Sequence, residues 1–150
     1  MKGLSARMRC LHVRAGGVDV ALPLAGLVEV CRQLPTEPAE GAVAGVIGVA
    51  RWRGAPTPVV DLRALLGGWA EGEREGAGQV GLHVLLHVGE RSVALAVTEV
   101  LGIVDLGADV PLPPLLAGVD AGLVQRLGLR DGAFVRVLDS ARILPSVPLA

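Results

Sequence analysis

Apolar and polar residues alternate along several short stretches of the chain. Branched apolar side chains recur at every second position in residues 18–22, 79–89 and 91–97. Such alternation places the apolar side chains on one face of an extended strand and is typical of half-buried β-strands. The pattern therefore predicts a strand in each of the three stretches.

Two tight turns are predicted between apolar runs. The pair Gly89-Glu90 links the second and third stretches, which predicts a hairpin over residues 80–97. The pair Asp131-Gly132 separates LVQRLGLR from AFVRVL, and Asp-Gly between two apolar runs is a strong hairpin signal. Both turns therefore indicate antiparallel pairing of neighbouring strands.

Helical signal is sparse. Short helical turns are expected in ALLGG, which closely follows Asp61, and in SARIL over residues 140–144. Connections are expected in three proline- or glycine-bearing stretches, at residues 34–41, 71–78 and 107–118. Many short strands with one or two short helices predict an all-β fold.

The sequence also contains a weak internal echo. The stretch VVDLRALL at residues 59–66 resembles VLDSARIL at residues 137–144, and LVEV at 27–30 resembles VTEV at 97–100. The two pairs are separated by similar lengths of chain, which predicts two related small barrels. Asp61 and Asp139 each end a strand and open a short helix, where an aspartate caps free amide groups, so capping is the favoured role for both.

Composition excludes several classes of protein. The 150 residues fit one compact domain or two packed halves, and 51% of them are hydrophobic but only 2% aromatic, so the core must be aliphatic. A net charge of −1 without a basic block gives no electrostatic footprint for nucleic acid. The longest charge-free runs are shorter than the ~18 residues of a membrane-spanning helix, and Arg7 and Arg9 interrupt any signal peptide. A cytoplasmic protein with reduced thiols is expected, with no insertion into a membrane.

Candidate catalytic and metal-binding residues are few. His83 and His87 share one face of a predicted strand about 13 Å apart, too far to hold one zinc ion, so both are predicted to lie at the surface or rim. Cys10 and His12 also share a strand face, where a thiolate–imidazole pair is conceivable, although a small buried thiol is the favoured role for Cys10. The sequence assembles no active site and predicts neither a metal nor a cofactor. A small-barrel enzyme or ligand-binding protein using Cys10 and His12 stays open as an alternative.

The stretch RWRG places Trp52 between two arginines. A lone Trp in an apolar chain is ordinarily part of the core. Here Arg51 and Arg53 flank it and Gly54 permits a turn, which argues instead for a partly exposed site, since Arg and Trp are enriched at interaction hot spots. The stretch is therefore predicted to belong to a docking surface, with Arg53 as its main contact residue.

These residues resemble the CheW-like family, the coupling proteins of bacterial chemotaxis-type signalling. That family carries a pattern close to G-V-x-N-x-R-G-x-x-x-P-V-x-D-L-R, matched here by Gly48, Val49, Arg53, Gly54, Pro58, Val59, Asp61, Leu62 and Arg63, with Arg51 at the Asn position. Further stretches resemble the family in the same order, at residues 21–30, 95–106, 110–119 and 128–144. The resemblance covers the chain from about Arg9 to Leu144 and implies a single CheW-like domain over residues 1–150, with an approximate core of 9–144.

Three residues depart from the family pattern. Arg51 stands where the family has Asn, and Thr98 stands where it has Asp after Val. Arg136 lies in a strand that is usually apolar on both sides. An adaptor in a kinase pathway other than chemotaxis therefore stays open as a variant.

The resemblance implies a fold, a role and partners. The fold is two SH3-like five-stranded barrels side by side with a hydrophobic groove between them, and the role is that of an adaptor without enzymatic activity. The implied partners are the regulatory domain of a CheA-type histidine kinase and the cytoplasmic helical tip of a chemoreceptor, which would bring the protein to receptor arrays on the inner face of the membrane. The residues implied in partner binding are Arg53, Gly54, Trp52, Val28, Glu29 and Gly128.

Overall fold

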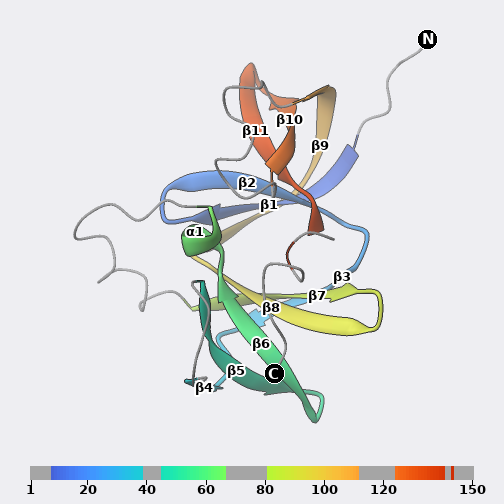
Figure 1. Cartoon of the computed structure of the whole chain (residues 1–150). Coiled ribbons are helices and arrows are strands. Elements are labelled where there is room, and N and C mark those ends of the chain that lie inside the picture. The colour runs from blue at the N-terminus through green and yellow to red at the C-terminus, as the bar shows by residue number, and fades with distance from the viewer. Residues whose placement is uncertain (1–7, 39–44, 67–80, 112–123, 141–142, 144–150) are drawn as a thin grey trace.

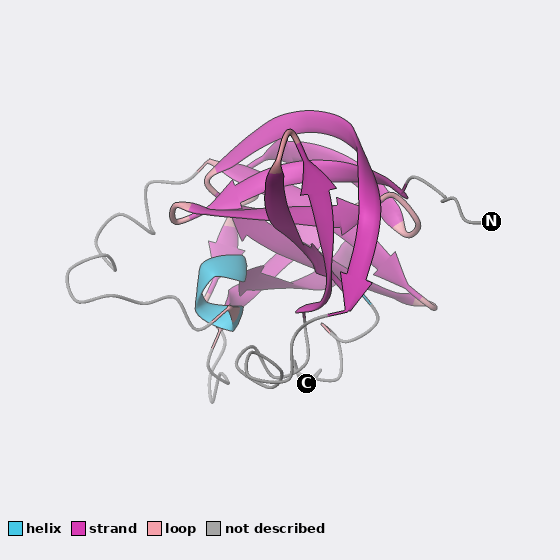
Figure 2. Ribbon diagram, turned by 90° about the horizontal axis from the view of Figure 1, so that it is seen from above, coloured by secondary structure: helices cyan, strands magenta, loops and turns pink. Residues whose placement is uncertain are grey.

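The computed structural model describes residues 8–38, 45–66, 81–111, 124–140 and 143. Most of these residues lie in strands, and one short helix lies at the side of the sheets (Figures 1 and 2). The elements are β1 Met8–Ala15, β2 Val18–Pro23, β3 Leu27–Arg32, β4 Thr36–Glu37, β5 Val46–Trp52, β6 Ala55–Asp61, α1 Leu62–Leu65, β7 Leu82–Val88, β8 Arg91–Val97, β9 Glu99–Pro111, β10 Val124–Arg130 and β11 Ala133–Leu138. The predicted all-β fold is confirmed.

Both predicted hairpins are present. β7 and β8 pair in antiparallel fashion around the turn Gly89-Glu90. β10 and β11 do the same around Asp131-Gly132, where both turn residues have positive φ. The strand predicted at residues 18–22 is β2.

The predicted connections are partly wrong. The connection expected at residues 107–118 begins inside β9, because Gly107 pairs with Leu129 and Val110 pairs with Leu127 of β10. The strand ends at Pro111, a position where the missing N–H of proline is tolerated. The expected loop at residues 34–41 contains β4, and the expected connection at residues 71–78 lies outside the described residues.

Five strands form a closed barrel, which is called the closed barrel below. Its order is β1-β2-β11-β10-β9, with β9 pairing back onto β1. Neighbouring strands are antiparallel except for β2 and β11, which run in parallel. These strands occupy the upper half of Figure 1.

The other six strands form a sheet that closes only in part, named here the open barrel. Its order is β3-β7-β8-β6-β5-β4, with β6 and β8 in parallel. A second closed five-stranded barrel was expected, but the strand that would correspond to β9 is interrupted between β3 and β4 at residues 33–35. Pro35 cannot donate to a strand ladder, which accounts for a break at this point.

The two barrels repeat one arrangement of strands. Each contains a hairpin (β1–β2 or β7–β8) whose second strand runs parallel to the last strand of another hairpin (β10–β11 or β5–β6). Those last strands are β6 and β11, which carry the echoed sequences noted above. The echo therefore corresponds to a structural repeat, although the open barrel is a continuous segment inserted between β2 and β9 of the closed one.

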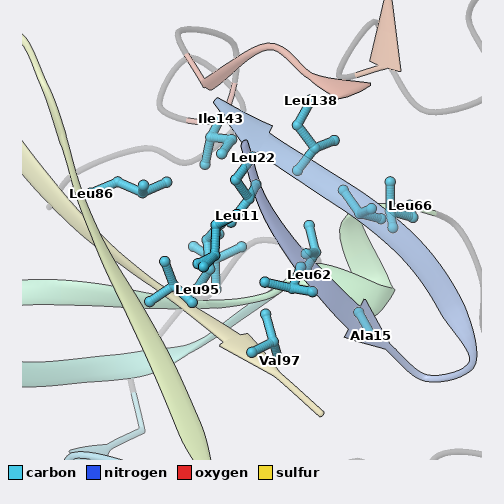
Figure 3. Close-up of a cluster of buried hydrophobic side chains, with 14 of the residues drawn as sticks. Leu11, Ala15, Leu22, Leu62, Leu66, Leu86, Leu95, Val97, Leu138 and Ile143 are labelled. Atoms are coloured by element: carbon cyan, nitrogen blue, oxygen red, sulfur yellow. The ribbon is translucent and has the colours of Figure 1, made fainter. Parts of the chain in front are cut away.

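One hydrophobic core joins the barrels. Figure 3 shows side chains from β1, β2, α1, β7 and β8 meeting in a single space. The fully buried members come from both barrels and include Val13, Val20, Leu22, Val60, Leu62, Val84, Val93, Leu95 and Leu138. Smaller clusters fill the interior of each barrel. Burial of this extent holds the two barrels together as one unit.

His83 contradicts the sequence-based interpretation of a surface or rim histidine. Its side chain is only 1% exposed, because it points into the open barrel with Leu85 while Val84 faces the shared core. The Nδ1 atom of His83 accepts a hydrogen bond of 3.1 Å from the backbone N–H of Leu34. Burial lowers the pKa of this imidazole, so the neutral ring is favoured.

Candidate functional site

The RWRG stretch forms the turn between β5 and β6, named here the RG tip after Arg53 and Gly54. Trp52 pairs with Ala55, so the two residues between them make a two-residue hairpin turn. Arg53 has φ of 54° and Gly54 has φ of 81°, and a type I′ turn requires positive φ at both positions. The turn projects from the lower right of the open barrel in Figure 1.

Arg53 folds back over the tryptophan beside it. Its Cζ atom lies 4.5 Å from the centroid of the Trp52 ring, a cation–π distance. Its Nη2 atom donates to the Glu29 carboxylate at 3.1 Å, while the side chain as a whole stays 67% exposed. The tip therefore presents a guanidinium whose position is fixed by two contacts.

Trp52 itself is core. The expectation of a partly exposed Trp52 is wrong, since the residue is only 8% exposed and packs with Val59, Leu85 and Ala94 inside the open barrel. The positive φ of Arg53 turns the chain back, so the guanidinium covers the ring instead of pointing away from it. Trp52 thus supports the tip from below.

Val28 and Glu29 lie on β3, beside the tip. The register between β3 and β7 shifts between Leu27 and Glu29, which marks a β-bulge. The side chain of Glu29 is 38% exposed and reaches Arg53, whereas Val28 packs against the Trp52 cluster. The structure therefore brings five of the predicted site residues together, namely Trp52, Arg53, Gly54, Val28 and Glu29, and three of them are half-buried or buried.

Gly128 lies elsewhere. It is buried in β10 of the closed barrel, whereas the RG tip belongs to the open barrel. Figure 1 shows β10 in the upper part of the molecule. A Cβ atom at this position would lie 2.6 Å from the Cδ1 atom of Leu106. The close packing of Leu106 therefore gives a structural reason for glycine at position 128, independent of any role in partner binding.

The residues that depart from the family pattern also have defined positions. The Nη1 atom of Arg51 donates to the carbonyl of Gly54 at 3.3 Å, which braces the RG tip. The Thr98 hydroxyl accepts a hydrogen bond of 2.9 Å from the N–H of Gly16. Arg136 is exposed on β11.

A cleft of about 450 Å³ lies between the two barrels. Its walls come from both of them, and the lining residues are Pro23, Ala25, Gly26, His87, Val88, Arg126, Val137, Leu138, Asp139 and Ser140. Most of these side chains are apolar. The Oγ atom of Ser140 is buried and has no hydrogen-bond partner within the described part of the chain.

His87 connects the cleft with the RG tip. Its ring lies 5.8 Å from the Trp52 ring, centroid to centroid, at an interplanar angle of 56°. Its Nδ1 atom lies 3.0 Å from the Ser92 hydroxyl across the hairpin. The sequence indicated only an exposed histidine here, because contacts between β7 and β5 depend on pairing that the alternation does not encode.

The two candidate capping aspartates differ in what the structure describes. Asp61 precedes α1, and its Oδ1 atom accepts a hydrogen bond of 3.0 Å from the N–H of Arg63. Burial raises the pKa of Asp61, although the amide donors of the helix oppose this. Asp139 precedes a turn in which the N–H of Ile143 donates to the Ser140 carbonyl at 3.2 Å, and residues 141–142 lie outside the described range.

Cys10 and His12 do not have the properties of a nucleophile and its base. Cys10 is fully buried inside the closed barrel, and burial raises the pKa of its thiol to about 11. The Nε2 atom of His12 lies 3.2 Å from Asp19, whose other carboxylate oxygen accepts a hydrogen bond from Arg14. A thiol of raised pKa is a weak source of thiolate at neutral pH.

Among the residues that the structure describes, no three His, Cys, Asp or Glu side chains are grouped so as to hold a metal ion. In that same part of the chain, no helix has the length and apolarity to cross a membrane.

Comparison with known proteins identifies the architecture. The family model described as a CheW-like domain matches residues 9–147. Among solved structures, the scaffolding protein TtCheW from Thermoanaerobacter tengcongensis is similar to this chain with a TM-score of 0.77 and 15% identity, over 89% of this chain and 90% of that one. This likeness shows the shared fold of two SH3-like barrels. No curated protein matches the chain.

Proposed function

Because the chain belongs to the CheW-like domain family, whose members are scaffolding adaptors rather than enzymes, we propose that it couples a chemoreceptor to a CheA-type histidine kinase. The observation that carries the proposal is the RG tip, which holds an exposed guanidinium in a fixed place at the end of a barrel. As a coupling adaptor it would work in the cytoplasm, at receptor arrays that it reaches through its partners.

The RG tip supplies the surface for the regulatory domain of the kinase. A guanidinium carries five N–H donors, and the single contact with Glu29 leaves others for carbonyl or carboxylate groups of a partner. Holding Arg53 over Trp52 before binding reduces the entropy lost when the complex forms. Gly54 adds no side chain at the point of closest approach, and its would-be Cβ meets nothing within 4 Å.

The cleft supplies the surface for the receptor. A receptor tip is a helical hairpin, and an amphipathic helix binds by laying its apolar face into an apolar groove. The cleft offers Pro23, Ala25 and Val88 for that face, with Arg126 and Asp139 as polar groups beside them. Val28, by contrast, does not line the cleft and packs against the Trp52 cluster inside the open barrel.

The proposal is tested by sedimentation of the protein with the regulatory domain of a CheA-type kinase from the same genome. We expect a complex that Arg53→Ala weakens by about tenfold or more, the usual size of a hot-spot effect. Asp131→Ala is the matched control, since it removes an exposed charge from the corresponding turn of the closed barrel.

Two results would count against this assignment. If neither protein nor variant forms a complex at concentrations well above micromolar, the kinase is not the partner. If Arg53→Ala markedly lowers the melting temperature of the protein together with its affinity for the kinase domain, Arg53 is a structural residue and the docking surface lies elsewhere.

A further inference from the structure

The RG tip and the cleft are proposed above as separate docking surfaces, but the structure joins them through side chains. His87 belongs to both, because it lines the cleft and its ring lies 5.8 Å from that of Trp52. Trp52 in turn carries the Arg53 guanidinium at 4.5 Å. The path from cleft to tip therefore contains only His87, Trp52 and Arg53.

A second path runs through the backbone beside it. Gly26 lines the cleft, and its carbonyl accepts a hydrogen bond of 2.7 Å from the N–H of His87. A Cβ at Gly26 would lie 2.6 Å from the His87 carbonyl oxygen, so the two backbones touch only because residue 26 is glycine. Gly26 directly precedes β3, which carries Glu29 to its contact with Arg53.

Both paths end on the same guanidinium. One supports Arg53 through the aromatic ring beneath it, and the other through the carboxylate beside it. A displacement at the His87–Gly26 contact thus acts on both supports of Arg53. Groups that belong to one network of contacts are expected to be energetically coupled, whereas the free-energy effects of changes at distant, independent sites are additive.

We propose that His87 is a positioning residue that couples the cleft to the RG tip, so that filling the cleft strengthens binding at the tip. His87 is exposed and lines the cleft, so an occupant of the cleft can contact its ring. An occupant that packs on this ring holds the ring against Trp52, which adds to the support that Trp52 and Glu29 already give Arg53 before the second partner arrives. A partner that meets an already ordered group loses less entropy on binding. This inference rests on the proposed function, which supplies the two partners.

The closed barrel provides a matched control. Arg14 faces Asp19 across the β1–β2 hairpin, just as His87 faces Ser92 across β7–β8. Arg14 is held by Asp19 and Glu99, and it is not among the residues that line the cleft. Replacing Arg14 therefore perturbs the corresponding position without touching the path from cleft to tip.

The test measures affinity of the kinase regulatory domain for the full chain, with and without a saturating helical-hairpin peptide of the receptor tip. We expect the peptide to tighten kinase binding about fivefold or more, the lower range of measured couplings. His87→Ala should abolish this gain, His87→Phe should restore most of it by keeping a ring against Trp52, and Arg14→Ala should leave it unchanged.

A spectroscopic measurement reads the same path without the kinase. The chain has two tryptophans, Trp52 and Trp69, so Trp69→Phe leaves Trp52 as the single reporter. Addition of the receptor peptide should shift the emission of Trp52 in this background. The shift should be lost when His87→Ala is added.

The possible outcomes are distinct. If both partners bind but the affinity for one is the same with and without the other, the coupling does not exist. If coupling persists in His87→Ala, it runs by another route and the inference is wrong. If neither partner binds at all, the proposed function fails first and the inference falls with it.

Discussion

The RG tip and the corresponding turn of the closed barrel have the same backbone conformation but present different side chains at the surface. We name the latter the DG tip, after Asp131 and Gly132. The first residue has φ of 54° in the RG tip and 49° in the DG tip, and the second has φ of 81° in both. Both tips are therefore two-residue hairpin turns of one type.

The side chains on these turns behave differently. Arg53 lies over Trp52 and binds Glu29, so its position is fixed by residues of two strands. The side chain of Asp131 is 87% exposed, and its carboxylate lies 3.8 Å from Nε of the adjacent Arg130. The barrel requires a turn with positive φ at this point, but it does not require the contacts that position Arg53. Those contacts are added to one copy of the repeat only.

The largest difference is expected beneath the tips. Trp52 and Arg130 occupy the same place before their turns, but Trp52 is 8% exposed and the side chain of Arg130 is 40% exposed. Trp52→Ala should lower the free energy of unfolding by about 3 kcal/mol, because it leaves a cavity in the open barrel. Arg130→Ala should change it by no more than about 0.5 kcal/mol. Urea denaturation followed by circular dichroism measures both, and equal losses would show that the two tips are supported alike.

The barrel interiors should differ in their response to pH. Cys10 and His83 occupy corresponding positions, one inside each barrel. The Cys10 thiol has its pKa raised by burial from 9.0 to about 11, so the folded state keeps a proton that the unfolded chain releases above pH 9. Stability should therefore fall as pH rises from 9 to 11, by about 2–3 kcal/mol, and Cys10→Ala should remove most of this dependence.

His83 should act at the opposite end of the pH range. Burial lowers its pKa below 6.5, so the unfolded chain takes up a proton that the folded protein resists. Stability should be full above pH 6.5 and should fall as the pH drops below that value, with a slope of at most about 1.4 kcal/mol per pH unit. His83→Asn keeps an acceptor near the Leu34 N–H and should flatten the acid limb of the curve. A wild-type curve without slope between pH 5 and 6.5 would contradict the buried neutral imidazole.

A small effect on folding is expected from exchanging the residues at the two tips. Arg53→Asp converts the RG turn to DG, and Asp131→Arg does the reverse. Because each backbone already accepts the other residue type at nearly the same φ, each exchange should change the free energy of unfolding by less than about 1 kcal/mol. Arg53→Asp should nevertheless abolish kinase binding, since it replaces the guanidinium and repels Glu29. Thermal melts and sedimentation of the same samples separate the two effects.

Local features of the fold could be predicted from the sequence. Alternation located β2, β7 and β8, and two turn dipeptides located the β7–β8 and β10–β11 hairpins, because both signals lie within a few residues of the structure they describe. The helical turn after Asp61 was likewise predictable from the capping residue and the apolar run behind it. The correspondence between β6 and β11 was visible as an internal sequence repeat, since each strand is the last strand of the equivalent hairpin in its barrel.

Features that depend on distant pairing could not be predicted in this way. Glu29 reaches Arg53 only because β3 and β5 lie in one sheet with a bulge in β3. His83 is buried because the second face of β7 is also covered, which alternation on the first face cannot reveal. The contact between His87 and Trp52 joins strands that are not adjacent in the sheet. Strand pairing and register thus bring the residues of the site together. The sequence alone indicated candidate residues such as Arg53 and Glu29 but not their contacts.

The insertion of one barrel into the other sets an order of completion while the chain is being made. All strands of the open barrel lie between Leu27 and Val97, so this barrel can form once that segment has left the ribosome. β1 and β2 are synthesised earlier, but the closed barrel that contains them cannot be completed until β11, which ends at Leu138, has been made. The RG tip can therefore exist on a nascent chain before the cleft does, because Val137 and Leu138 form part of the cleft wall.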